Sequence, residues 1–178
     1  MFLFMAVIIF GLFTEQCFAL NNQKFSDFEA KKPFIEQEIE RSIPLNNNIT
    51  YTEVPRGIIL SVAQSELFEE NSDKISQNGK LLLEKIGILL NNFENNCTIE
   101  AHTEETLNIN GYYKTDWEIS IVRANKIADY LSKIIYNSTD RLFPVGFGKI
   151  MPFKENVARK EFSDNRIDFV IFDYTAKR

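Results

Sequence analysis

The feature that most constrains the fold is an alternation of strand-like and helix-like segments that begins near Gly57. Apolar residues recur at helical spacing in two segments, 73–93 and 115–136. A third segment, 154–162, has the character of a partly helical connection. Four short runs with strand patterns flank these segments: 58–62, 97–102, 142–148 and 167–172. This order, β-α-β-α-β-(α)-β, predicts an α+β two-layer sandwich with helices packed on one face of a small mixed sheet.

The helix starts can be predicted from side chains that accept hydrogen bonds from free backbone N–H groups. Asn71, Ser72 and Asp73 indicate the start of the first helix. Thr115 and Glu118 have the spacing of a capping box, which predicts that the second helix begins at residue 115 or 116.

The first third of the chain differs from the rest. Residues 1–13 are almost wholly apolar but fall short of the ~20 residues that span a bilayer. With small residues at Cys17 and Ala19, they predict a signal peptide over 1–19, although the first basic residue is Lys24. Lipidation at Cys17 and an uncleaved anchor remain alternatives. Residues 20–54 predict a polar extension or linker that contains one amphipathic helix, and 55–175 form the predicted compact domain.

The composition excludes several classes of function. A net charge of -5 and a pI near 5.1 argue against a nucleic-acid partner. If the signal peptide is removed, Cys97 is the one cysteine left, and it suits a buried strand position. His102 is the single histidine and suits a structural role. The sequence shows no arrangement of catalytic residues, so we expect no enzyme activity, no metal and no cofactor.

Two charged residues stand where a site can form. Glu104 follows the strand 97–102, and Arg123 lies early in the second helix. A carboxylate can bind an ammonium group, and a guanidinium can bind a carboxylate through two parallel hydrogen bonds. The pair therefore suits a ligand that carries both charges.

Several motifs agree in order and spacing with a known family. They are His102-Thr103-Glu104, Asp116-Trp117-Glu118-Ile119-Ser120 with Arg123-Ala124, Gly146-Phe147-Gly148 with Pro152 and Asn156, and Asn165-Arg166-Ile167-Asp168. With these motifs, residues 57 to 173 resemble the OmpA/MotB C-terminal domain, a peptidoglycan-associating module of bacterial envelopes. Trp117 is expected to pack at the helix start, and Gly146 and Gly148 to form a turn.

The resemblance implies a ligand and the residues that bind it. The family binds the peptidoglycan stem peptide without covalent bonding, through the ammonium and carboxylate at the side-chain end of meso-diaminopimelate. By position, the acid is Glu104 and the arginine is Arg123. The full set of implied ligand-binding residues is Thr103, Glu104, Asp116, Ile119, Arg123 and Arg166.

Three positions depart from the family pattern. Glu104 replaces aspartate, Asp116 replaces asparagine, and Ala101 replaces the glycine before the histidine. The tail has one arginine where the family usually has two. A gapless alignment places Arg166 on the first of them, and a one-residue deletion places it on the second.

The first functional hypothesis is an exported protein of the periplasm, possibly associated with the outer membrane, that acts as a non-covalent cell-wall tether. The alternative is an interaction module of a secretion or motility complex whose degenerate pocket binds protein partners. A flagellar stator is disfavoured because residues 1–13 lack the length of a membrane span and a proton-accepting aspartate.

Overall fold

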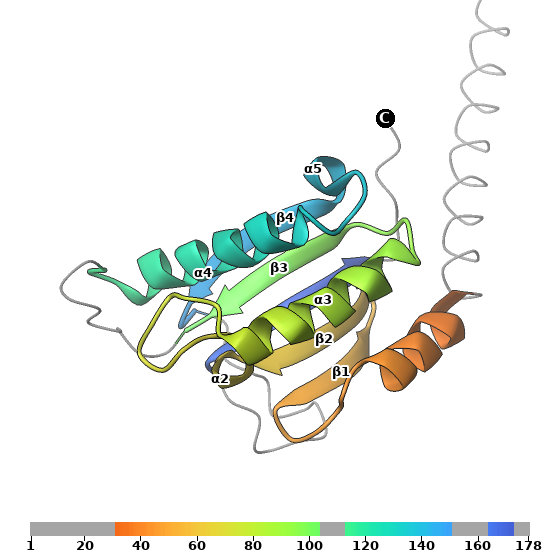
Figure 1. Ribbon diagram of the computed structural model, residues 1–178, viewed down its shortest axis with the longest axis horizontal. Coiled ribbons are helices and arrows are strands. Elements are labelled where there is room, and N and C mark those ends of the chain that lie inside the picture. The colour runs from red at the N-terminus through yellow and green to blue at the C-terminus, as the bar shows by residue number, and fades with distance from the viewer. Residues whose placement is uncertain (1–30, 104–112, 151–163, 173–178) are drawn as a thin grey trace, which may run out of the picture.

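The computed structural model describes residues 31–103, 113–150 and 164–172 (Figure 1). The predicted signal peptide, Glu104, and the predicted connection at 154–162 lie outside these residues. Within the described residues, no helix combines the length and the apolar character needed to cross a membrane. The named elements follow the chain in this order: β1 (Ile49–Val54), β2 (Gly57–Ala63), α2 (Gln64–Leu67), α3 (Gln77–Asn91), β3 (Cys97–His102), α4 (Asp116–Leu131), α5 (Ser138–Arg141), β4 (Leu142–Gly148) and β5 (Arg166–Phe172).

The strands form one mixed sheet in the order β1-β2-β5-β3-β4. β5 lies between β2 and β3 and is antiparallel to both, whereas β3 and β4 are parallel. As a result β2, β3 and β4 all run in the same direction, and their carboxyl ends meet at one end of the sheet. α3 and α4 cover one face of the sheet (Figure 1), which confirms the predicted α+β fold.

The core lies between the helices and the sheet. Alternate residues of β2, β3 and β5 point into it, as the period of two in a strand requires. Ile99 and Phe169 are fully buried there, against Leu83 and Ile86 of α3 and Ile127 of α4. Cys97 is a buried free cysteine, and burial raises the pKa of its thiol to about 12. The thiol is therefore neutral and packs as an apolar side chain.

The segment before the predicted domain adds to this core. Residues 31–42 are helical, and Ile35, Ile39 and Ile43 are almost completely buried within the core. These are residues of the amphipathic helix that the sequence indicated. β1 follows and pairs with β2, so 31–54 packs as part of the folded unit where the sequence had indicated a spacer. The strand escaped prediction because the surrounding residues are mostly polar.

The two main helices differ in how well their starts were predicted. α4 begins as expected: the Thr115 hydroxyl accepts a hydrogen bond from the N–H of Glu118, and the Glu118 carboxylate accepts one from the N–H of Lys114. The predicted start of α3 at residues 71–73 is wrong. α3 begins at Gln77, where the Ser76 hydroxyl accepts a hydrogen bond from the N–H of Gly79.

Candidate ligand site at the carboxyl ends of three strands

The candidate site lies at the end of the sheet where β2, β3 and β4 finish. Gln64 directly follows β2, Thr103 directly follows β3, and Arg123 reaches the same place from the second turn of α4. The loop between α2 and α3 closes this end, because Ser72 on that loop also contacts Arg123. The topology thus brings together Gln64, Thr103 and Arg123, which are far apart in the sequence, and the loop after α2 adds Ser72.

Arg123 is a buried guanidinium, 4% exposed. It donates one hydrogen bond to the side-chain oxygen of Gln64 and another, of 2.7 Å, to the backbone oxygen of Ser72. Its guanidinium carbon lies 4.9 Å from the centre of the Phe68 ring, a cation–π arrangement. Burial lowers the pKa of Arg123 from 12.5 to about 10, so the group remains charged at neutral pH.

No described carboxylate forms an ion pair with Arg123, and its Nε makes no hydrogen bond among the described residues. A buried charge without a counter-ion is costly, because water is lost and no opposite charge replaces it. A guanidinium has five N–H donors, and the described residues accept hydrogen bonds from two of them. The remaining donors, and the lack of an ion pair with any described carboxylate, make Arg123 the candidate group for binding an anion.

Gln64 connects the two sides of the site. Its amide nitrogen donates to the backbone oxygen of His102 at 2.7 Å and to the hydroxyl oxygen of Thr103 at 2.8 Å. Its amide oxygen accepts from Arg123. The Gln64 side chain is buried, so these bonds are shielded from water.

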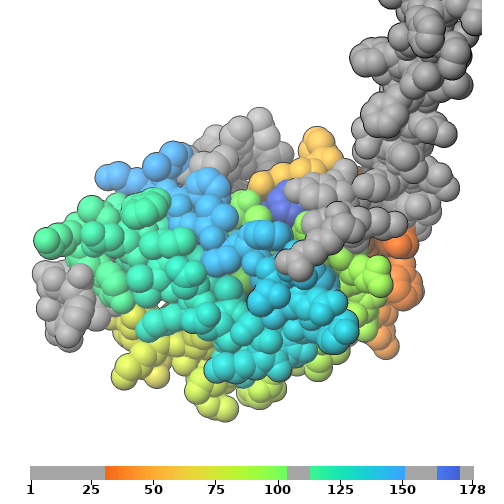
Figure 2. All heavy atoms as spheres, turned by 90° about the horizontal axis from the view of Figure 1, so that it is seen from above, coloured from red at the N-terminus to blue at the C-terminus, as the bar shows by residue number. Residues whose placement is uncertain are grey.

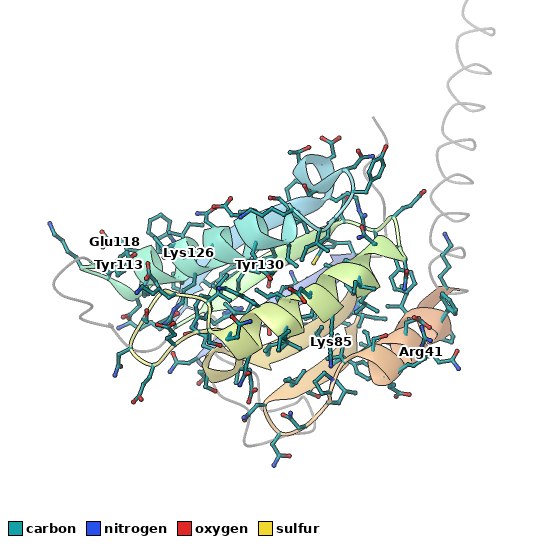
Figure 3. All side chains as sticks on the ribbon, in the orientation of Figure 1. Arg41, Lys85, Tyr113, Glu118, Lys126 and Tyr130 are labelled. Carbon is teal, nitrogen blue, oxygen red and sulfur yellow. The ribbon has the colours of Figure 1, made fainter. Side chains whose placement is uncertain are left out.

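The negative charge of Asp73 acts on Arg123 and raises its pKa, but the Asp73 carboxylate already accepts hydrogen bonds from other residues. Lys126 donates to it at 2.6 Å and Tyr113 at 2.7 Å, both at the end of the molecule that holds the site (Figure 3). Partial burial alone would raise the pKa of Asp73, but the hydrogen bonds from Lys126 and Tyr113 outweigh it and lower the pKa. The same contact raises the pKa of Tyr113 to about 12.

The structure gathers most of the predicted residues that it describes. Thr103 is 1% exposed, and its N–H donates to the Gly148 oxygen at 3.0 Å. Asp116, Ile119 and Arg123 lie on one side of α4, since they are three and four residues apart. Ile119 is fully buried, and an oxygen of Asp116 is 3.9 Å from the Lys149 nitrogen.

Arg166 lies apart from this group. Strand alternation places it on the face of the sheet opposite the helices, with His102 and Asp168. Its Nε donates to Asp168 at 2.9 Å, and an oxygen of Asp164 is 3.8 Å from its Nη1. The structure therefore gives Arg166 acidic partners within the protein, and a role in ligand binding stays a prediction.

The same face carries a buried polar cluster. Ligand-type atoms of Glu100, His102 and Asp168 lie within 4.8 Å of one another. Arg56, however, binds both oxygens of Glu100 at 2.9 and 3.0 Å, and Arg166 binds Asp168. Two guanidinium groups thus balance two carboxylates, and the cluster needs no cation to neutralise it.

His102 packs within this cluster. Its ring is 3% exposed and stacks on Phe147 with 5.1 Å between ring centres, and its Nε2 lies 3.3 Å from Asp168. Burial alone would raise the pKa of Asp168, but the nearby imidazole of His102 and the charge of Arg166 outweigh it and lower the pKa. These contacts agree with the structural role expected of His102.

The end of β4 packs against the start of α4 (Figure 2). A Cβ on Gly146 would collide with the backbone of Ile121, and Gly148 has a positive φ of 54° and donates its N–H to Ser120 at 3.0 Å. Both glycines therefore allow close contact between strand and helix. The prediction that Trp117 packs at the helix start is wrong for its side chain, which is 56% exposed.

Sequence reasoning missed Gln64, Ser72 and Phe68 as contacts of Arg123. The sequence offered a weak signal for Gln64 and Phe68, because both follow a predicted strand, and binding residues often lie in the loops after strands. Ser72 had none, since it contributes a backbone oxygen, which every residue possesses.

The helices and the mixed sheet define a domain of the α+β class. The OmpA family model matches residues 67–166, more than half of the chain, and the chain belongs to this family. As the sequence predicted, the family's domain is not an enzyme. The chain is also 30% identical over 118 residues to the uncharacterized protein YtxE of Bacillus subtilis. The aligned region covers 65% of this chain and 48% of YtxE. It thus spans about half the length of this relative.

Two solved structures share the fold. A MotB-like protein from Desulfovibrio vulgaris superposes with a TM-score of 0.72 at 19% identity, over 88% of this chain and 98% of that one. The cell wall anchor of the T6SS from Pseudomonas aeruginosa gives a TM-score of 0.60 at 19% identity, over 79% of this chain and 94% of that one. At these identities the likeness shows the fold alone.

Proposed function

We propose that this protein is an exported envelope protein that binds peptidoglycan without covalent bonding and acts as a tether to the cell wall. Two findings support the proposal: the chain belongs to the OmpA family, and one protein with the same fold is a cell wall anchor. The observation that carries it is the buried charge of Arg123, which has no acidic partner among the described residues.

The ligand we propose is the diaminopimelate of the stem peptide. Its side-chain carboxylate binds Arg123 and supplies the missing negative charge, through a bidentate pair. Its ammonium binds Glu104, which lies beyond the described residues. Thr103, Asp116 and Ile119 complete the contacts, with Arg166 as a further candidate.

Cosedimentation with purified diaminopimelate-type peptidoglycan tests the proposal. We expect the wild-type protein to pellet with the cell wall and the Arg123→Ala and Glu104→Ala variants to remain in the supernatant. Lys133→Ala is the control, because it removes a cation just after α4, beside the groove between α3 and α4. If Arg123→Ala pellets as wild type does while folded, the carboxylate contact is excluded.

A second candidate is an interaction module that binds a protein within an envelope complex. It is favoured by a groove of about 450 Å³ between α3 and α4, lined by Ile88, Tyr130 and Ile134 with Glu84 and Lys133. Tyr130 from α4 marks this region (Figure 3). Ile88 is 61% exposed.

The two candidates predict different results. For the second, wild-type protein fails to pellet with the cell wall, and a protein partner co-purifies from envelope extracts. Ile88→Asp then abolishes that association, while Arg123→Ala leaves it unchanged.

A further inference from the structure

We propose that Gln64 is the positioning residue that prepares Arg123 to receive a carboxylate. This inference rests on the proposed function, since it concerns the same site. It adds a residue that belongs to none of the motifs shared with the family, and it explains how the site keeps its shape before the ligand arrives.

The first step in the argument is geometric. The Gln64 amide makes three hydrogen bonds: its nitrogen donates to the His102 oxygen at 2.7 Å and to the Thr103 hydroxyl oxygen at 2.8 Å, and its oxygen accepts from Arg123. One planar group therefore fixes the carboxyl end of β3 and the guanidinium on α4 relative to each other. No other described side chain bonds to both Thr103 and Arg123.

The second step concerns charge. An arginine side chain has many rotamers, and holding it in place before binding reduces the entropy lost on binding. A carboxylate at position 64 would hold Arg123 too, but it would also neutralise the charge that attracts the ligand. A neutral amide oxygen orients the guanidinium and adds no negative charge to offset it. A glutamine therefore serves an anion receptor better than the isosteric glutamate.

The third step concerns the other half of the amide. Because its nitrogen donates to two oxygens, the amide can take only one orientation, with the oxygen toward Arg123. Thr103 is also fixed by its own N–H, which donates to Gly148. The β3 end is thus rigid, and Gln64 transmits that rigidity to Arg123.

The test compares two substitutions in the full-length protein. Gln64→Met keeps the shape of the side chain and removes all three hydrogen bonds, whereas Gln64→Glu keeps an oxygen beside Arg123 and adds a negative charge. The control is Asn95→Leu at the opposite end of the sheet, where a buried amide donates to the Phe172 oxygen at 2.7 Å. Affinity is measured by calorimetry for two probes: free meso-diaminopimelate and the form whose side-chain carboxylate is amidated.

We expect wild type to prefer the carboxylate probe to the amidated one. Gln64→Met should weaken binding of the carboxylate probe at least tenfold. Gln64→Glu should abolish the preference, since its own carboxylate occupies Arg123. Asn95→Leu should lower the melting temperature and leave the preference unchanged. A purely structural role for Gln64 predicts instead that Gln64→Met and Gln64→Glu weaken binding of both probes equally, and that result would overturn the inference.

A separate readout keeps this test independent of the proposed function. If wild type binds neither probe, the proposed ligand is wrong, but the NMR signal of the Arg123 Nε–H still reports how firmly the guanidinium is held. Gln64 positions Arg123 if this signal is sharp in wild type and in Asn95→Leu but is broadened by exchange in Gln64→Met. An unchanged signal in Gln64→Met refutes the positioning role.

Discussion

Replacing Arg123 by methionine tests whether this buried arginine serves to stabilise the fold or to bind a ligand. Removing this cation from water destabilises the folded protein. The lowering of its pKa from 12.5 to about 10 corresponds to a loss of about 3 kcal/mol in the free energy of unfolding. Methionine keeps much of the packing on Phe68 and abolishes that cost. The substitution leaves the Gln64 oxygen without its hydrogen bond, which costs about 1–3 kcal/mol. The Ser72 oxygen is partly exposed and can bind water instead.

The two terms nearly cancel, so we expect the free energy of unfolding to change by no more than about 1 kcal/mol. Urea unfolding followed by circular dichroism measures this change, and cosedimentation with peptidoglycan measures binding in the same preparation. Binding should be lost while stability is retained. A fall in stability of more than about 3 kcal/mol would show that Arg123 is there to hold the fold, and the argument for an anion receptor would fail.

Arg141 provides the matched control. It is partly buried, and burial lowers its pKa as it does that of Arg123; its guanidinium donates to the backbone oxygens of Leu90, Phe93 and Asn95. These oxygens lie in the last turn of α3 and just after it, where carbonyls lack helical partners. Arg141→Met should therefore lower the free energy of unfolding by at least about 2 kcal/mol and leave peptidoglycan binding by the folded fraction unchanged.

Three further predictions concern local structure. Thr115→Ala removes the side-chain cap of α4 and should cost about 0.5–2 kcal/mol in urea unfolding, whereas Thr115→Ser should cost little. The pKa of Asp73 is lowered in the folded state, so its bond to Lys126 stabilises the fold above about pH 4 and is lost as the pH falls through the folded pKa. Asp73→Asn should therefore reduce the loss of stability that is measured between pH 5 and pH 2. An unchanged pH profile in this variant would contradict the prediction. Gly57→Ala should lower the melting temperature by several degrees, since Gly57 has a φ of 141° and an added Cβ would collide with the Ile171 oxygen; a melting temperature equal to wild type would refute the strain.

The sequence determined the elements of the compact domain because their signals are local. The alternation at β3 and β5 and the helical spacing of α3 and α4 depend only on neighbouring residues, and these elements were predicted correctly apart from the start of α3. The cap at Thr115 was predicted for the same reason. β1 was missed, since a polar edge strand has a weak pattern until its partner β2 is known.

The sequence and its resemblance to the OmpA family also selected Thr103 and Arg123 as candidates, but the relation between them was decided only by the tertiary structure. Gln64, at the end of β2, meets both because β2 and β3 run in the same direction with β5 between them. Burial of Arg123 without an acidic partner among the described residues is likewise a property of packing, since helical spacing does not specify what surrounds a side chain. A linear pattern records which residues share a face, whereas the distances and charges across a site depend on segments that are joined only when the chain folds.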